Sequence, residues 1–203
     1  MPRPRRVTEL DLESVTTRPL TPGDWPAVAT LFGEHGACGG CWCMWWRMPR
    51  HGQAWQDAKG EPNRRALEEL VRGGRQHAIL ALLGDAPAGW CSFGPRESFP
   101  YLTRSRALAR QAPEGTWSVV CFFVAARYRG QGLGTLLLDA AAARALALGA
   151  TEVEGFPVVP HADRIPAAFA YTGLPAQFTA AGFKPTRRAG DARPIYVRRP
   201  DAR

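Results

Sequence analysis

The fold of this chain is decided by the stretch Val119-Val-Cys-Phe-Phe-Val-Ala-Ala-Arg-Tyr-Arg-Gly-Gln-Gly-Leu-Gly-Thr-Leu-Leu-Leu138. A run of β-branched and aromatic residues ends near Val124, and a loop rich in arginine and glycine follows it. An apolar helix is then expected to open near Thr135. Glycines let the backbone approach a ligand closely, and the N–H groups of the loop and of the helix N-terminus favour an anion. The stretch therefore predicts a strand–loop–helix junction that binds a phosphate group.

The length and composition indicate one globular domain. The 203 residues, of which 45% are hydrophobic, allow a full core. No apolar run reaches the roughly 18 residues of a membrane span. We expect a flexible basic arm over residues 1–16, which includes Arg3, Arg5 and Arg6, and a single domain over residues 17–203.

The net charge of +8 says little about function, because much of the excess lies near the two ends of the chain. Such clusters are typical of solvated surface, and the chain lacks the interleaved aromatic and basic residues of a nucleic-acid recognition motif. We therefore expect neither nucleic acid nor a membrane as a partner, and a monomer or homodimer in solution.

Five cysteines, an odd number, do not form a disulfide framework. Cys91 and Cys121 lie in apolar, strand-like runs, where a cysteine behaves as a small buried hydrophobe. We expect a reducing, cytoplasmic location.

Hydrophobic periodicity and turn residues divide the rest of the chain. Helices are expected over residues 25–32, 61–71, 132–148 and 174–181, and strands near 18–20 and over 77–83, 88–93, 117–124, 151–159, 183–187 and 195–199. Residues 94–115 are expected to form a long irregular connection.

The glycine loop lacks the ending of a Walker A motif and the spacing of the dinucleotide fingerprint. Its pattern Arg129-x-x-Gly132-x-Gly134, between a hydrophobic strand and a leucine-rich helix, resembles the acetyl-CoA signature of the GNAT acetyltransferase superfamily. The string Gln177-Phe-Thr-Ala-Ala-Gly-Phe183 is similar to the late helix of that family. Ala126 departs from the pattern, because many members have proline there.

The resemblance implies an α/β (α+β) fold with a mixed, strongly twisted sheet of about six to seven strands. Helices would cover both faces, and the two central parallel strands would splay apart. Acetyl-CoA, the acyl donor, would place its pantetheine arm along residues 122–124 and its pyrophosphate on the glycine loop. The cofactor-binding residues implied are Phe122, Phe123, Val124, Arg129, Gly130, Gln131, Gly132, Leu133, Gly134, Thr135 and Phe178.

The implied reaction is direct attack of an amine on the acetyl group. A backbone N–H near Phe123 or Val124 is the family-like donor to the oxyanion. Many members have a glutamate on the strand before the loop and a late tyrosine, but this strand has no carboxylate and the late position is Phe178. Glu154 is therefore our candidate base and Tyr171 our candidate acid, with His161 as a secondary choice.

The segment His35-Gly-Ala-Cys-Gly-Gly-Cys-Trp-Cys-Met-Trp-Trp-Arg47 is unusual in its cysteines and tryptophans. His35, Cys38, Cys41 and Cys43 could supply four zinc ligands by type and number, but their spacing differs from common structural sites, and we expect no metal. The string resembles a Cys-Trp-Cys-Met-x-Trp-Arg loop in a subgroup of GNAT proteins. The subgroup names no substrate, but the GNAT resemblance implies that this region lines the acceptor pocket. Trp42, Trp45 and Trp46 are therefore expected to bind the acceptor, the alternative being core packing.

These observations favour an acetyl-CoA-dependent N-acetyltransferase of a small-molecule amine. Two alternatives stay open. One is an N-acetyltransferase of proteins such as ribosomal proteins, and the other is a GNAT fold that senses acyl-CoA or zinc without turnover.

Overall fold

In a computed structural model of the chain, which describes residues 10–48, 52–108, 110–160, 166, 169–189 and 193–200, seven strands form one sheet. Their order is β1-β2-β3-β4-β5-β7-β6, and the one parallel pair among them is β4 with β5. The strands are β1 (Val15–Pro19), β2 (Ala78–Leu83), β3 (Ala86–Pro95), β4 (Thr116–Val124), β5 (Glu152–Gly155), β6 (Lys184–Ala189) and β7 (Arg193–Arg198). The mixed sheet predicted from the sequence is thus confirmed.

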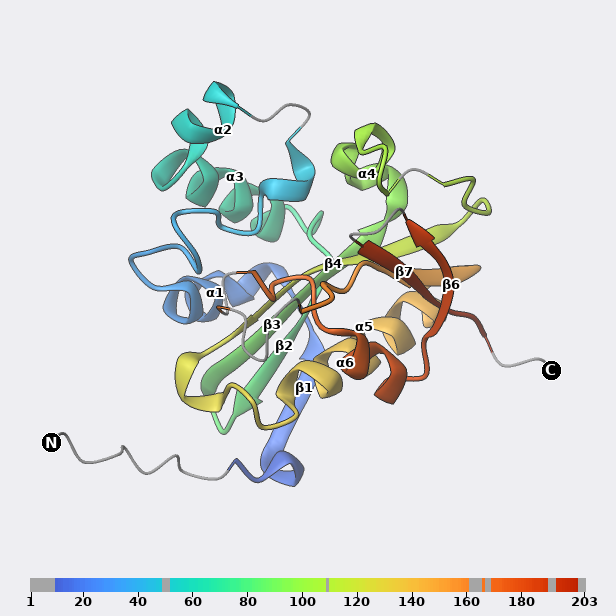
Figure 1. The fold of residues 1–203 in the computed structure, drawn as a ribbon. Helices are drawn as coiled ribbons and strands as arrows, with labels where there is room; N and C mark the ends of the chain where they lie inside the picture. The colour runs from blue at the N-terminus through green and yellow to red at the C-terminus, as the bar shows by residue number, and fades with distance from the viewer. Residues whose placement is uncertain are drawn as a thin grey trace, which may run out of the picture.

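Helices cover both faces of the sheet, as predicted. They are α1 (Trp25–Phe32), α2 (Gln53–Ala58), α3 (Glu61–Arg72), α4 (Pro100–Arg104), α5 (Leu133–Ala147) and α6 (Pro175–Ala180). Figure 1 shows α5 and α6 on one side of the sheet and α1 and α3 on the other. No helix among the described residues is long and apolar enough to cross a membrane.

The alternation of side chains along the strands separates two hydrophobic cores. Leu80, Trp90 and Val120 face the core that α1 and α3 complete. Their neighbours in sequence, such as Ile79 and Cys91, face the core built with α5. Helix α5 lies against five adjacent strands, β1 to β5, which explains why its sequence is nearly all apolar.

Most predicted elements lie where the sequence places them, but the strand expected over residues 151–159 is shorter. β5 pairs with β4 only from Thr116 to Val119, opposite Glu152 to Gly155. Beyond Gly155 the two strands separate, and the N–H of Val158 donates instead to the carbonyl of Gly173, at 2.9 Å. The predicted irregular connection 94–115 contains the short helix α4, and α2 was not predicted.

Part of the predicted flexible arm belongs to the sheet. Val15 and Thr16 open β1 and pair with Leu83 and Leu82 of β2. Leu10 donates its N–H to the side-chain oxygen of Gln131, at 2.6 Å, so the glycine loop holds this segment. Residues 1–9 of the arm lie outside the described part of the chain.

Substitution of Gly155 tests the packing at the point where β4 and β5 separate. A methyl group at this position would overlap the ring of Phe178, which is fully buried. We expect Gly155→Ala to lower the free energy of unfolding by about 1–3 kcal/mol, the usual effect of overpacking. Gly23→Ala is the matched control, because its new methyl group would meet only Thr21, at 3.9 Å. Urea denaturation of both variants checks this, and equal stabilities would contradict the packing described.

Candidate active site

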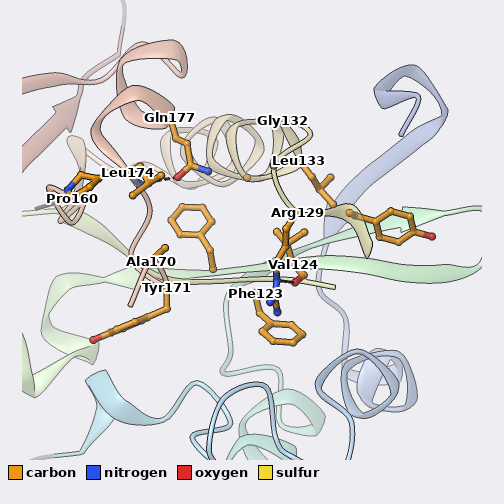
Figure 2. A pocket seen from close by; sticks show the side chains of 14 residues that line it. Phe123, Val124, Arg129, Gly132, Leu133, Pro160, Ala170, Tyr171, Leu174 and Gln177 are labelled. Atoms are coloured by element: carbon orange, nitrogen blue, oxygen red, sulfur yellow. Dashed lines mark hydrogen bonds between the residues drawn. The ribbon is translucent and has the colours of Figure 1, made fainter. Parts of the chain in front are cut away.

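The glycine loop encloses a cavity at the end of β4, which we call the glycine-loop cavity (Figure 2). Gly130 and Gly132 have φ angles of 75° and 86°, in the left-handed region that favours glycine. Gly132 directly precedes α5, so the cavity meets the N-terminus of that helix. The cavity has a volume of about 530 Å³. Its lining residues are Phe122, Phe123, Val124, Tyr128, Arg129, Gly130, Gly132, Leu133, Gly134, Pro160, Ala170, Tyr171, Leu174 and Gln177.

Eight of the eleven residues predicted to bind the cofactor are in this lining, and three are not. Gln131 accepts a hydrogen bond from the N–H of Leu10 and donates one to the carbonyl of Arg127, at 3.1 Å. Phe178 is 0% exposed and packs on Phe183, with ring centroids 5.1 Å apart. The prediction that Phe178 contacts the cofactor is therefore corrected: this ring fills the space beside Gly155. Thr135 lies in the first turn of α5, outside the lining.

Gln177 is the polar lining residue that the sequence reasoning missed. Its side-chain oxygen accepts the N–H of Leu174, at 2.8 Å, which fixes the amide at the start of α6. The amide nitrogen lies close to Gly134, where a Cβ would overlap it. Figure 2 shows this side chain above the cavity, facing the first turn of α5. The resemblance to the family's late helix placed Gln177 in that helix, but it did not indicate that the side chain contacts Gly134.

The backbone of β4 leaves one N–H directed at the glycine-loop cavity. Ala125 donates its N–H toward β3, to the carbonyl of Ala88 at 3.0 Å, whereas Phe122 donates away from β3, to the carbonyl of Tyr171 at 2.6 Å. Because successive N–H groups alternate in direction along a strand, the N–H of Phe123 points to β3 and that of Val124 to the open side. Of the two predicted oxyanion donors, only Val124 is placed to act.

Tyr171 lies between two cavities. Its carbonyl occupies the edge of β4, and its ring points away from Gly132 in Figure 2, toward Trp46, at a centroid distance of 6.3 Å. The candidate acid is thus close to the end of β4. The secondary candidate His161 lies outside the described residues.

Glu154, the candidate base, lies in a buried ion-pair network instead of a cavity. It is 0% exposed, pairs with Arg96 and with Arg110, the latter at 2.7 Å, and accepts the hydroxyl of Ser118 at 2.7 Å. Burial alone would lower the pKa of Arg110, but its hydrogen bonds to Glu152 and Glu154 raise it. Glu154 lines neither cavity, and its oxygens are engaged by Arg96, Arg110 and Ser118, so the structure argues against Glu154 as the base.

A second cavity, which we call the aromatic cavity, has a volume of about 500 Å³ and lies on the α1 side of β4. Its lining residues are Phe32, Ala37, Cys38, Cys41, Cys43, Trp45, Trp46, Trp55, Cys121, Phe122, Phe123, Arg129, Phe169 and Tyr171. Phe122, Phe123, Arg129 and Tyr171 line both cavities. The two spaces therefore meet at the end of β4.

Trp45 and Trp46 line the aromatic cavity, but Trp42 does not. Trp42 is 3% exposed and packs on Trp25 and Phe32, with centroid distances of 5.8 Å and 5.6 Å. Its prediction as an acceptor residue is therefore corrected to core packing. The left-handed φ of 44° at Trp42 turns the ring inward, against the Cα of Gly36.

The four candidate zinc ligands do not converge. Cys41 donates to the carbonyl of Gly36, at 3.7 Å, and Cys43 accepts the indole N–H of Trp90, at 3.2 Å. Cys38 is exposed. Within the described ranges, no three His, Cys, Asp or Glu side chains are grouped to hold a metal ion.

Known proteins resemble this chain in sequence pattern and in fold. The pattern of the acetyltransferase (GNAT) family matches residues 43–166. Among solved structures, a GNAT-family protein from Desulfovibrio desulfuricans is 19% identical, with 91% of this chain and 98% of that chain covered and a TM-score of 0.53. The ribosomal-protein-S5-alanine acetyltransferase from Vibrio fischeri is 13% identical, with 95% and 96% covered and a TM-score of 0.52.

The aminoglycoside acetyltransferase AAC(6')-Ib, solved with ribostamycin and coenzyme A, is 17% identical. The alignment covers 92% of this chain and 93% of that chain, with a TM-score of 0.53. At these identities the likeness is one of fold. No curated protein matches the sequence.

The ion-pair network predicts a structural role for Glu154. Glu154→Gln leaves Arg96 and Arg110 without one of their buried counter-charges, and we expect it to lower the free energy of unfolding by about 3 kcal/mol. The control is Glu97→Gln, because Glu97 is exposed and lies on the connection that carries Arg96 and Arg110. This variant should leave stability nearly unchanged. Thermal or urea unfolding measures both. A Glu154→Gln protein as stable as the control would contradict the network's role.

Proposed function

The chain belongs to the acetyltransferase (GNAT) family, and from this premise we propose that it transfers the acetyl group of acetyl-CoA to the amine of a small molecule. The observation that supports this best is the meeting of the two cavities at the end of β4. One is suited to a phosphate-bearing donor and the other to a flat apolar acceptor, so donor and acceptor would approach from opposite sides of the strand end.

The glycine-loop cavity fits the pyrophosphate end of acetyl-CoA. The left-handed glycines bring the backbone close, and the N-terminus of α5 favours negative charge. Arg129 adds a positive charge, and its Nε donates to the carbonyl of Val124, at 2.8 Å, which links the loop to the strand end. The N–H of Val124 would then stabilise the oxyanion formed when an amine attacks the acetyl carbonyl.

The aromatic cavity favours an acceptor with one amine on an apolar body. The rings of Trp45 and Trp55 line this cavity and can contact a flat group or an ammonium ion, whereas Trp46 is fully buried in the adjoining core. No carboxylate is present among the described residues that line this cavity. A polyamine such as the ribostamycin bound by AAC(6')-Ib would need several anionic partners, so we propose that the shared fold does not extend to a shared acceptor.

A panel of amines tests this proposal. Release of the coenzyme A thiol is measured with acetyl-CoA and either aromatic monoamines whose amine lies on an alkyl chain, ribostamycin, or peptides bearing a free N-terminal alanine. We expect turnover with the aromatic monoamines and little with the other two. Preferred acetylation of the peptides would favour the protein acetyltransferase instead. Binding of acetyl-CoA without turnover of any acceptor would favour a sensor.

The glycine loop gives a prediction that is independent of the acceptor. Gly130 and Gly149 both have left-handed φ angles, 75° and 94°, and open space where a Cβ would lie, but only Gly130 lines the cavity. Both alanine variants should therefore be strained alike. We expect Gly130→Ala to raise the Kd of acetyl-CoA about tenfold, equivalent to roughly 1.4 kcal/mol. Calorimetric titration of both variants measures this, and an equal loss of affinity in Gly149→Ala would contradict it.

A further inference from the structure

Acetyl transfer to an alkylamine requires a base, because the free amine has a pKa near 10.4 and is protonated at neutral pH. The described lining of the two cavities contains no carboxylate and no histidine. Its titratable side chains are cysteines and tyrosines, together with Arg129. Three of the thiols, those of Cys41, Cys43 and Cys121, lie on the side of β4 that faces the aromatic cavity.

Cys43 differs from the other two in its surroundings. It is 5% exposed and belongs to the cavity lining, and its sulfur accepts the indole N–H of Trp90, at 3.2 Å. Trp90 is fully buried, and its indole N–H donates to Sγ of Cys43. A buried N–H donor aimed at a sulfur stabilises the thiolate more than the thiol.

Arg47 supplies a positive charge without a carboxylate partner among the described residues. This half-buried side chain donates to the carbonyl of Ser98, at 3.4 Å, and its guanidinium lies over the ring of Phe99, 4.8 Å from the centroid. The salt bridges of the described chain engage other arginines. Burying a cation without a counter-charge is unfavourable, and a Cys43 thiolate is the nearby group able to provide one.

The backbone holds Cys43 in this position under strain. Trp42 and Cys43 have left-handed φ angles of 44° and 59°, which are uncommon for residues with a large side chain. The ring of Trp42 is fixed in the core between Trp25 and Phe32, so the next residue is directed at β3 and β4. Such strain is concentrated at functional sites.

The groups around Cys43 come from three elements and from its own loop. They are Cys121 on β4, Trp90, Cys91 and Ser92 on β3, Arg47 beyond the loop and Cys41 within it. Burial alone would raise the pKa of the Cys43 thiol, but hydrogen bonds from Cys121 and Trp90 and the charge of Arg47 lower it below the ordinary value. The pKa of Cys121 is raised well above its ordinary value by its hydrogen bond to Cys43 and by burial, so Cys121 stays protonated as a donor.

We propose that Cys43 is a thiolate at the base of the aromatic cavity and is the catalytic base that deprotonates the acceptor amine. This inference rests on the proposed acetyltransferase function. It gives the Cys-Trp loop a chemical role and supplies the base that Glu154, held in its ion pairs, does not.

The Cys43 thiolate takes one proton from the acceptor ammonium, and the neutral amine nitrogen attacks the acetyl carbonyl carbon. A C–N bond forms while the carbonyl electron pair moves to oxygen, near the N–H of Val124. Collapse breaks the C–S bond, and the second nitrogen proton goes to the sulfur of coenzyme A. Cys43 then loses its proton to solvent, and no oxidant or reductant is needed.

The first experiment measures the ionisation state of Cys43 without any acceptor. Thiolate ultraviolet absorbance is titrated in the wild type, in Cys43→Ala, and in Cys91→Ala, a control that removes a buried thiol on the opposite face of β3. We expect a thiolate at neutral pH in the wild type and in the control and none in Cys43→Ala. A wild type without a thiolate below the ordinary thiol pKa of about 8.5 would overturn the proposal.

The second experiment measures pH–rate profiles with the best amine of the panel. We expect Cys43→Ser to lower kcat by about 10²-fold or more and to lose the lower inflection, with the Kd of acetyl-CoA unchanged. Trp90→Phe removes one donor to the sulfur, and should move the inflection upward while the plateau rate is retained. An unchanged profile in Cys43→Ser would overturn the base role.

Mass spectrometry after a single turnover separates a base from a nucleophile. We expect no acetyl group on Cys43, and an acetylated Cys43 would overturn the base role in favour of a covalent intermediate. If the wild type acetylates no amine, the proposed function fails and the base role fails with it. The thiolate titration still reports separately on the Cys43 site.

Discussion

The separation of β4 from β5 is the constraint on which the rest of the site depends. The strands pair only as far as Val119 and Gly155, and beyond that point Phe178 packs where a side chain on residue 155 would lie. Past this point β4 is still paired with β3 but has no strand beside it on the β5 side, so Val124 can direct its N–H into a cavity. A parallel pair that continued to Val124 would close both cavities at their meeting point.

Buried charge holds the paired half of these strands. Glu152 and Glu154 lie on β5, and both pair with Arg110. Glu154 also pairs with Arg96, and Glu152 also pairs with Arg199. Removal of one member would leave its partners with fewer counter-charges in a buried site, so the network fixes the position of β5 more than it adds net stability. The same arrangement keeps both carboxylates out of the lining of the two cavities.

Much of this fold could be predicted from the sequence. The helix over residues 25–32 has the bounds of α1, because Asp24, Pro26 and Gly33 mark its ends locally. The glycine loop was identified because its conformation is set by the residues it contains. The surroundings of Glu154 and Phe178 could not be predicted in this way, because they depend on residues distant in the sequence. Glu154 pairs with Arg96 and Arg110, and Phe178 packs on Gly155.

The different positions of the tryptophans could also not be predicted from the sequence alone. Composition identified a cluster of aromatic side chains, but left-handed backbone angles separate the core residue Trp42 from the cavity residues Trp45 and Trp46. The sequence does not predict left-handed φ angles at a tryptophan or a cysteine, because such angles are uncommon at residues other than glycine. Cys43 and Trp90 are 47 residues apart in the chain, and the fold brings them into hydrogen-bonding contact.

A crystal structure with coenzyme A and an aromatic monoamine would test the roles of the glycine loop, Val124 and Cys43 together. We expect the pyrophosphate on the backbone of residues 129–134, the coenzyme sulfur beside Val124, and the amine in the aromatic cavity within hydrogen-bonding reach of Cys43. A coenzyme bound elsewhere, or an acceptor on the far side of β4 from Cys43, would contradict it.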